Sequence, residues 1–181
     1  PLEITEELAT EKGINIDREG FLKELEKHRA LSRTASAGKF KGGLADSSVA
    51  TTRLHTAAHL LLAALRQVLG DGVFQKGSNI TAERLRYDFS YPEKMTKEQI
   101  TQVENLVNEA IAKKIPVNCE EVSLEEAKNT GAMGVFESKY GEKVKVYAVG
   151  EVSREICGGP HVSNTSELGH FSIIKEESSS S

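Results

Sequence analysis

Two pairs of metal-ligand residues stand far apart in this sequence. His55 and His59 lie four residues apart, and Cys157 and His161 bracket Gly158-Gly159-Pro160 far downstream. On a helix, residues four apart leave the same face one turn apart. A loop of two glycines and a proline favours a tight turn that points a thiolate and an imidazole to one centre. Because zinc prefers nitrogen and sulfur donors in a tetrahedron, the sequence predicts a zinc site with ligands His55, His59, Cys157 and His161.

Each pair alone has a simpler explanation, since such residues also serve as core or surface side chains. Both pairs occur in a chain with only two cysteines and five histidines, which favours a metal site. The other cysteine, Cys119, is expected to pack as a small apolar side chain, and His28 and His170 receive no role. The residues around these ligands do not match two known classes of zinc enzyme. Thr56 stands where a zincin helix carries its general-base Glu, and the Glu and Pro-Cys-x-x-Cys pattern of zinc deaminases is absent.

Composition narrows the class of protein further. The chain has 181 residues, of which 38% are hydrophobic, enough for one sizeable core and a helical appendage. Its longest apolar stretch, residues 60–65, is far shorter than the roughly 20 residues of a membrane-spanning helix. Two cysteines and no recognisable signal sequence favour a cytoplasmic protein. A net charge of −4 argues against indiscriminate binding to nucleic acid.

Helices and strands must position these ligands. Apolar residues recur at helical spacing from about Ser48 to a stop at Gly70, so the His pair is expected on a long helix. Asp17 precedes an amphipathic helix, Thr96 begins a capping box for a third long helix that Pro116 ends, and Ser123 begins a shorter one. Alternating patterns predict strands over residues 84–91 and 143–148, and an apolar run at 171–174 predicts another.

This order predicts an α+β fold, with helices packed on a mostly antiparallel sheet and an N-terminal helical segment. The stretch from Ser36 to Gly43 is small, basic and rich in glycine, which marks a boundary. We therefore expect an N-terminal helical segment over residues 1–37 and a zinc-binding domain over residues 38–181.

Four stretches resemble a known family in order and spacing. They are His55-Thr56-Ala57-Ala58-His59-Leu60-Leu61, Gln75-Lys76-Gly77-Ser78, Arg84-Leu85-Arg86-Tyr87-Asp88-Phe89 and Cys157-Gly158-Gly159-Pro160-His161-Val162. Together they are similar to the editing domain of alanyl-tRNA synthetase, whose metal motifs are shared by stand-alone alanyl-tRNA editing proteins and threonyl-tRNA synthetase. The segment from Phe40 to Asp46 is similar to one that the synthetase typically carries, which favours the synthetase over the stand-alone proteins.

The resemblance implies hydrolysis of serine or glycine wrongly esterified to tRNA(Ala), at a zinc site. It implies catalytic roles for Gln75, Cys157 and Thr56. It also implies two partners, the 3′ end of tRNA(Ala) and the rest of a synthetase chain. Lys39, Lys41, Arg84 and Arg86 are candidate phosphate contacts, although such charges also occur on any solvated face. No aminoacylation domain is recognisable, so no ligase activity is expected from these residues alone.

Several alternatives follow from the same residues. The Thr56 hydroxyl either contacts a substrate or bonds back to its own helix, and the Gln75 amide either orients substrate or water or caps a loop. Four protein ligands are typical of a closed structural zinc site, whereas a catalytic site keeps a position open. The second functional hypothesis is therefore a catalytically inactive, zinc-stabilised tRNA-binding module. Pro160 stands where the family commonly has Thr, which removes a hydroxyl and an N–H beside the predicted metal.

Overall fold

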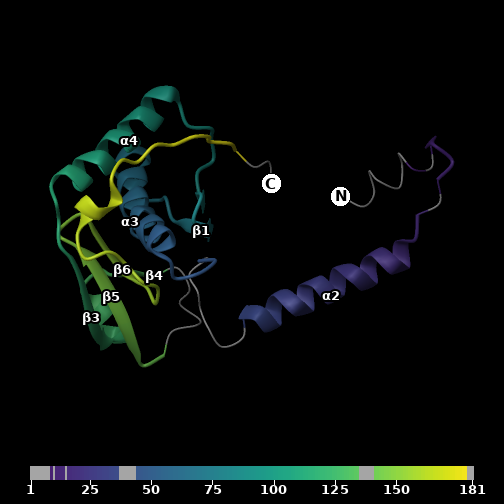
Figure 1. The fold of residues 1–181 in the computed structure, drawn as a ribbon, viewed down its shortest axis with the longest axis horizontal. Helices are drawn as coiled ribbons and strands as arrows, with labels where there is room; N and C mark the ends of the chain where they lie inside the picture. Colours follow the sequence, from purple (N-terminus) through teal and green to yellow (C-terminus); the bar gives the residue numbers. More distant parts are fainter. Residues whose placement is uncertain (1–8, 10, 15, 37–43, 135–140, 179–181) are drawn as a thin grey trace. The chain divides into compact units, whose positions relative to one another are not determined.

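The computed structural model describes residue 9 and residues 11–14, 16–36, 44–134 and 141–178, with the backbone alone for 28–36. The chain divides into two compact units, residues 1–40 and 41–181. In the first unit, helix α2 spans Arg18–Ser36 (Figure 1). Asp17 begins it as predicted, because its Oδ1 accepts the backbone N–H of Gly20 at 2.8 Å. None of the described helices is long and apolar enough to cross a membrane.

Helix α3, Val49–Leu69, is the central helix of the second unit and carries the His pair. Ser48 caps it by accepting the N–H of Thr51, and the chain leaves it at Gly70, whose φ of 105° favours glycine. Both ends agree with the prediction. The residues from His55 to Leu62 are all buried, so this helix lies inside the unit rather than on its surface.

Helix α4, Lys97–Ala112, packs along α3 (Figure 1). Its predicted capping box is present, with Thr96 and Gln99 each accepting the other's backbone N–H. Val103 and Val107 face the core, which they share with Leu60, Leu62 and Leu65 of α3. This apolar contact fixes the helix that carries His55 and His59.

The strands form two sheets. Strands β1 (Gln75–Ile80) and β2 (Leu85–Phe89) make an antiparallel hairpin. The larger sheet has the order β3-β5-β6-β4 and is antiparallel except where β4 runs parallel to β6. Its strands are β3 (Val117–Ser123), β5 (Lys143–Val149), β6 (Ser153–Ile156) and β4 (Met133–Gly134). The predicted α+β class with a mostly antiparallel sheet is confirmed.

The two faces of this larger sheet have different partners. Val144, Val146 and Ile156 form a small core with Ala127 of helix α5, Leu124–Asn129. Because side chains alternate along a strand, Val149, Ser153 and Glu155 belong to the opposite face. Val149 joins the core that contains α3 and α4, so this second face is directed towards the helix with the His pair.

The prediction of a strand over residues 171–174 is wrong. The segment follows the short 3-10 helix η2, Thr165–Leu168, and forms no strand ladder. Its backbone is bound instead by side chains of α4. Asn108 bonds both the N–H and the carbonyl of Phe171, at 2.9 and 2.8 Å, and Glu104 accepts the N–H of Ile173 at 2.6 Å. These side chains thus make the hydrogen bonds to the main chain that a neighbouring strand would otherwise make.

Candidate metal centre

Helix α3 presents His55 and His59 on one buried face. Each residue is 4% exposed, and their ring centroids are 5.4 Å apart. Nδ1 of His55 lies 3.0 Å from the carbonyl oxygen of Pro160, a contact that orients the ring. Since both imidazoles leave a rigid, buried helix, the positions of two potential ligands are set by the core.

Strand β6 and the loop after it bring Cys157 and His161 to the same place. Cys157 continues the alternation of Ser153 and Glu155, so its side chain is directed towards α3. Its N–H donates to the carbonyl of Lys145 at 3.0 Å, which holds it beside β5. Gly159 packs directly under the His55 ring, where any side chain would collide with the imidazole.

The four predicted ligands come together. One donor atom from each of His55, His59, Cys157 and His161 lies within 4.8 Å of every other. Cys157 Sγ is 3.3 Å from His55 Nε2, near the separation of about 3.5 Å that sulfur and nitrogen ligands have in a zinc tetrahedron. Nε2 of His161 is buried without a hydrogen-bond partner among the described residues. Because the Thr56 hydroxyl lies against the other ring nitrogen of His161, Nε2 is the atom left to bind a metal.

Burial also fixes the protonation of these groups. It lowers the pKa of His55 and His59 to about 4, and the neighbouring His59 contributes to the shift of His55. The pKa of His161 is lowered strongly, by burial first and then by the other two histidines. Three neutral imidazoles therefore offer lone pairs at neutral pH. Burial raises the pKa of the Cys157 thiol to about 11, so the thiol keeps its proton until a cation replaces it.

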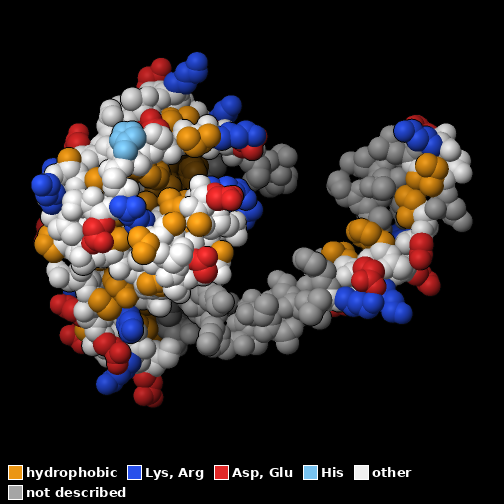
Figure 2. Space-filling view, viewed as in Figure 1, with side chains coloured by type: hydrophobic (Ala, Val, Ile, Leu, Met, Phe, Trp, Pro, Cys, Tyr) orange, Lys and Arg blue, Asp and Glu red, His pale blue; other side chains and the backbone are white. Residues whose placement is uncertain are grey.

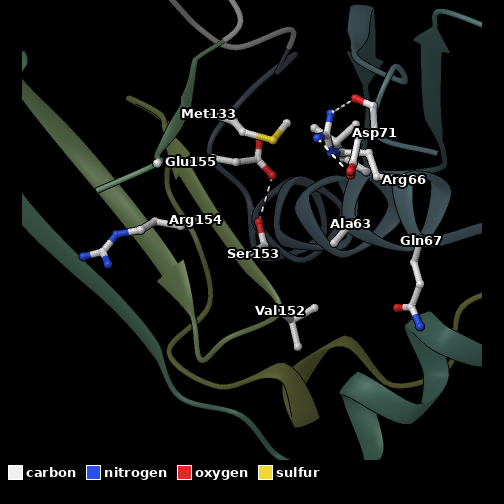
Figure 3. A pocket seen from close by; sticks show the side chains of 11 residues that line it. Ala63, Arg66, Gln67, Asp71, Met133, Val152, Ser153, Arg154 and Glu155 are labelled. Carbon is white, nitrogen blue, oxygen red and sulfur yellow. Dashed lines mark hydrogen bonds and ion pairs between the residues drawn. The ribbon is translucent and has the colours of Figure 1, made fainter. Parts of the chain in front are cut away.

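Sequence reasoning missed Glu155, a buried carboxylate next to this cluster. Its Oε1 accepts the Ser153 hydroxyl at 2.9 Å and lies 3.7 Å from Nδ1 of His59. Ser153 and Glu155 line a pocket of about 300 Å³. Figure 3 shows these two side chains with Met133 beside Glu155 and the Arg66–Asp71 ion pair at another wall. The available signal was its position two residues before Cys157, which places both side chains on one face of β6.

Thr56 lies beside the cluster but its hydroxyl is fully engaged. It donates to the carbonyl of Thr52 at 3.1 Å, accepts the N–H of Val162 at 3.1 Å and lies 3.2 Å from Nδ1 of His161. The residue has no exposed surface. These contacts favour the back-bonding alternative over a direct contact with substrate.

The other predicted site residues lie on the β1–β2 hairpin or outside the described residues. Gln75, at the start of β1, donates to Ser78 at 3.1 Å and accepts from the Tyr87 hydroxyl at 3.4 Å. Arg84 and Arg86 are exposed, and Arg86 forms an ion pair with Asp88 at 3.2 Å. Lys39 and Lys41 fall in the range 37–43, which the structure does not describe.

The expectation that Cys119 packs as an apolar side chain is wrong, because Cys119 is exposed. It lies on β3, an edge strand of the sheet, and the polar run around it leaves this part of the strand open to solvent. His170 is also exposed, and the side chain of His28 lies outside the described part of the chain. His170 does not belong to the cluster.

The fold and the cluster define an α+β domain with four potential metal ligands gathered around one point. Residues 144–181 match the family described as "Threonyl and Alanyl tRNA synthetase second additional domain". The whole chain is 59% identical to an alanine–tRNA ligase of Treponema denticola and 54% identical to that of Borrelia hermsii. Over 99% of the chain, it is 58% identical to the ligase of Treponema pallidum.

The chain belongs to the alanyl-tRNA synthetase family, and the resemblance predicted from its motifs is confirmed. It spans about 30% of the length of these relatives. The segment that matches the family begins in β5 and includes Cys157 and His161. The ligases match over the whole of this chain, so their matches also include the helix with His55 and His59.

Proposed function

We propose that this chain is an aminoacyl-tRNA editing domain that hydrolyses serine or glycine from mischarged tRNA(Ala) at a zinc site. The observation that carries the proposal is the meeting of His55, His59, Cys157 and His161 around one point, in a chain of the alanyl-tRNA synthetase family. Three neutral imidazoles and a thiol suit zinc better than magnesium or calcium, which prefer oxygen ligands. When bound, zinc supplies Lewis acidity to an ester carbonyl or water beside it.

The need for such a site follows from the small size of alanine. A pocket that accepts a methyl side chain discriminates against an added hydroxyl or a missing methyl by only about 1–3 kcal/mol. A second, hydrolytic site corrects the resulting errors. We propose that this site meets the 3′ end of tRNA(Ala), that the rest of a synthetase chain holds the tRNA body, and that both act in the cytoplasm. No ligase activity is expected from this chain alone.

The chain's own residues supply orientation at this site. Thr56 holds His161 from inside the unit, and the Pro160 carbonyl contacts His55. Because a carbonyl makes this second contact, proline in place of threonine at position 160 leaves it intact. Gln75 lies on a separate strand, where its amide is held by Ser78 and Tyr87. We propose that this amide orients the substrate or a water.

Charged contacts with the tRNA are a separate part of the proposal. We assign Arg84 and Arg86, together with Lys39 and Lys41, to phosphates near the 3′ end. On the face of the second unit seen in Figure 2, basic and acidic side chains are intermixed rather than grouped by sign. Such a surface suits a domain that binds only the end of a tRNA.

Deacylation of seryl-tRNA(Ala) tests the proposal. The wild-type chain should release serine above the buffer background and leave alanyl-tRNA(Ala) intact. Cys157→Ala should reduce release to background because it removes a buried ligand. Cys119→Ala provides a matched control, since it makes the same chemical change at an exposed cysteine. Background release by the wild-type chain, with zinc bound, would support the inactive tRNA-binding module instead. The four protein ligands, typical of a closed site, are the observation that favours that alternative.

A second prediction concerns the number of protons that the protein releases when it binds zinc. At pH 7 the three histidines are neutral and the Cys157 thiol, with a pKa of about 11, is protonated. Since zinc binds the thiolate, loading the metal-free protein should release about one proton per ion. Calorimetric titrations with zinc in buffers of different ionisation enthalpy measure this number. Cys157→Ala should release none, and proton release from this variant equal to that of the wild type would contradict the assignment of Cys157 as a ligand.

A further inference from the structure

Glu155 is a buried carboxyl group that the proposed chemistry does not use, and burial raises its pKa to about 7. It is 5% exposed and lies on the face of β6 directed towards α3. Burying a carboxylate is costly unless polar groups compensate for the lost hydration. The Ser153 hydroxyl supplies one such group, at 2.9 Å from Oε1. The same oxygen lies 3.7 Å from Nδ1 of His59.

The Nδ1 atoms of the three histidines follow one pattern. Nδ1 of His55 lies 3.0 Å from the Pro160 carbonyl, and Nδ1 of His161 lies 3.2 Å from the Thr56 hydroxyl. Nδ1 of His59 is buried and has no partner within hydrogen-bond distance among the described residues. The carboxyl group of Glu155 faces it, with Oε1 at 3.7 Å. Each ring thus has an oxygen atom on its Nδ1 side.

We infer that Glu155 is a positioning residue of the metal centre, where its carboxylate, anchored by Ser153, accepts the Nδ1–H of His59 and fixes that imidazole as a ligand. Carboxylates in this outer position orient the ring, select its tautomer and make the ligating nitrogen more basic. The inference rests on the proposed metal site but does not depend on catalysis. It gives a reason for the buried carboxyl group that packing alone does not provide.

Glu155→Gln tests the inference, because the amide keeps the shape of the side chain and removes its charge. Cobalt(II) and zinc affinities are measured by competition with a chelating dye, and the visible spectrum of the cobalt protein reports ligand geometry. The variant should bind both ions about 10–100-fold more weakly, with a shifted cobalt spectrum. Glu151→Gln is the matched control, since it makes the same change at an exposed glutamate on the turn before β6. It should match the wild type.

Ser153→Ala provides a second variant that keeps the carboxylate and removes its anchor. It should weaken metal binding in the same direction by a smaller factor, and it decides the question if Glu155→Gln does not fold. Wild-type affinity and spectrum in a folded Glu155→Gln protein would overturn the inference and leave the metal site standing. Failure of the wild-type chain to bind either ion would overturn the proposed metal site itself, and the inference with it.

Discussion

Replacing Gly159 with alanine should abolish stoichiometric metal binding and reduce deacylation by about a hundredfold or more. A Cβ at this position would overlap Cε1 of His55 and lie 2.7 Å from its Nδ1. The imidazole leaves a buried helix, and its Nδ1 contacts the carbonyl of Pro160, the residue that follows Gly159, so the ring is held against this loop. The loop must therefore move, and it carries Cys157 and His161 with it. Overpacking of this kind also destabilises a fold by about 1–3 kcal/mol.

The neighbouring glycine provides the control for this prediction. A Cβ added to Gly158 has no atom within 4 Å, and Gly158 is exposed. Gly158→Ala should therefore bind one metal ion with wild-type affinity. Elemental analysis of the purified variants, together with the deacylation rate, measures both effects. Equal metal content in the two variants would mean that the loop accommodates a side chain beneath His55.

Removal of the metal should lower the free energy of unfolding of the second unit by about 4 kcal/mol. This value compares the metal-free protein with protein in free zinc at about a thousand times the dissociation constant. The ligands join α3 to the loop after β6, so an ion that binds only the folded state links the central helix to the sheet. Thermal unfolding with and without a chelator measures the difference. The Cys157→Ala variant should show a much smaller shift, and a wild-type shift in that variant would place the stabilising metal elsewhere.

The metal-free protein should also become less stable as the pH falls from about 6.5 towards 4. The folded-state pKa of His55 and His59 is lowered from 6.5 to about 4 by burial. Between these values the unfolded chain binds protons that the folded state excludes, so the free energy of unfolding decreases with falling pH. Denaturant unfolding at several pH values measures this slope. The metal-loaded protein should retain its stability to a lower pH, because bound histidines cannot be protonated.

Local patterns in the sequence predicted the helices well. The start of α3 at Ser48, its end at Gly70 and the Thr96–Gln99 capping box depend on residues only a few positions apart. The strands were harder to predict. Strand β1 contains Gly77 and mostly polar residues, and β6 has only four residues, so neither shows a clear alternation. Residues 171–174 have an apolar, strand-like sequence, yet α4 binds their backbone through Asn108 and Glu104.

The sequence by itself determined which four residues are the candidate ligands and which helix presents two of them, because a spacing of four residues places His55 and His59 on one helix face. Only the tertiary structure decided which groups surround these donors. It buried Thr56 against His161, exposed Cys119 on an edge strand and placed Glu155 beside His59. Helix periodicity is a local property of the chain. The partners of a buried polar group come instead from segments that meet only when the core forms.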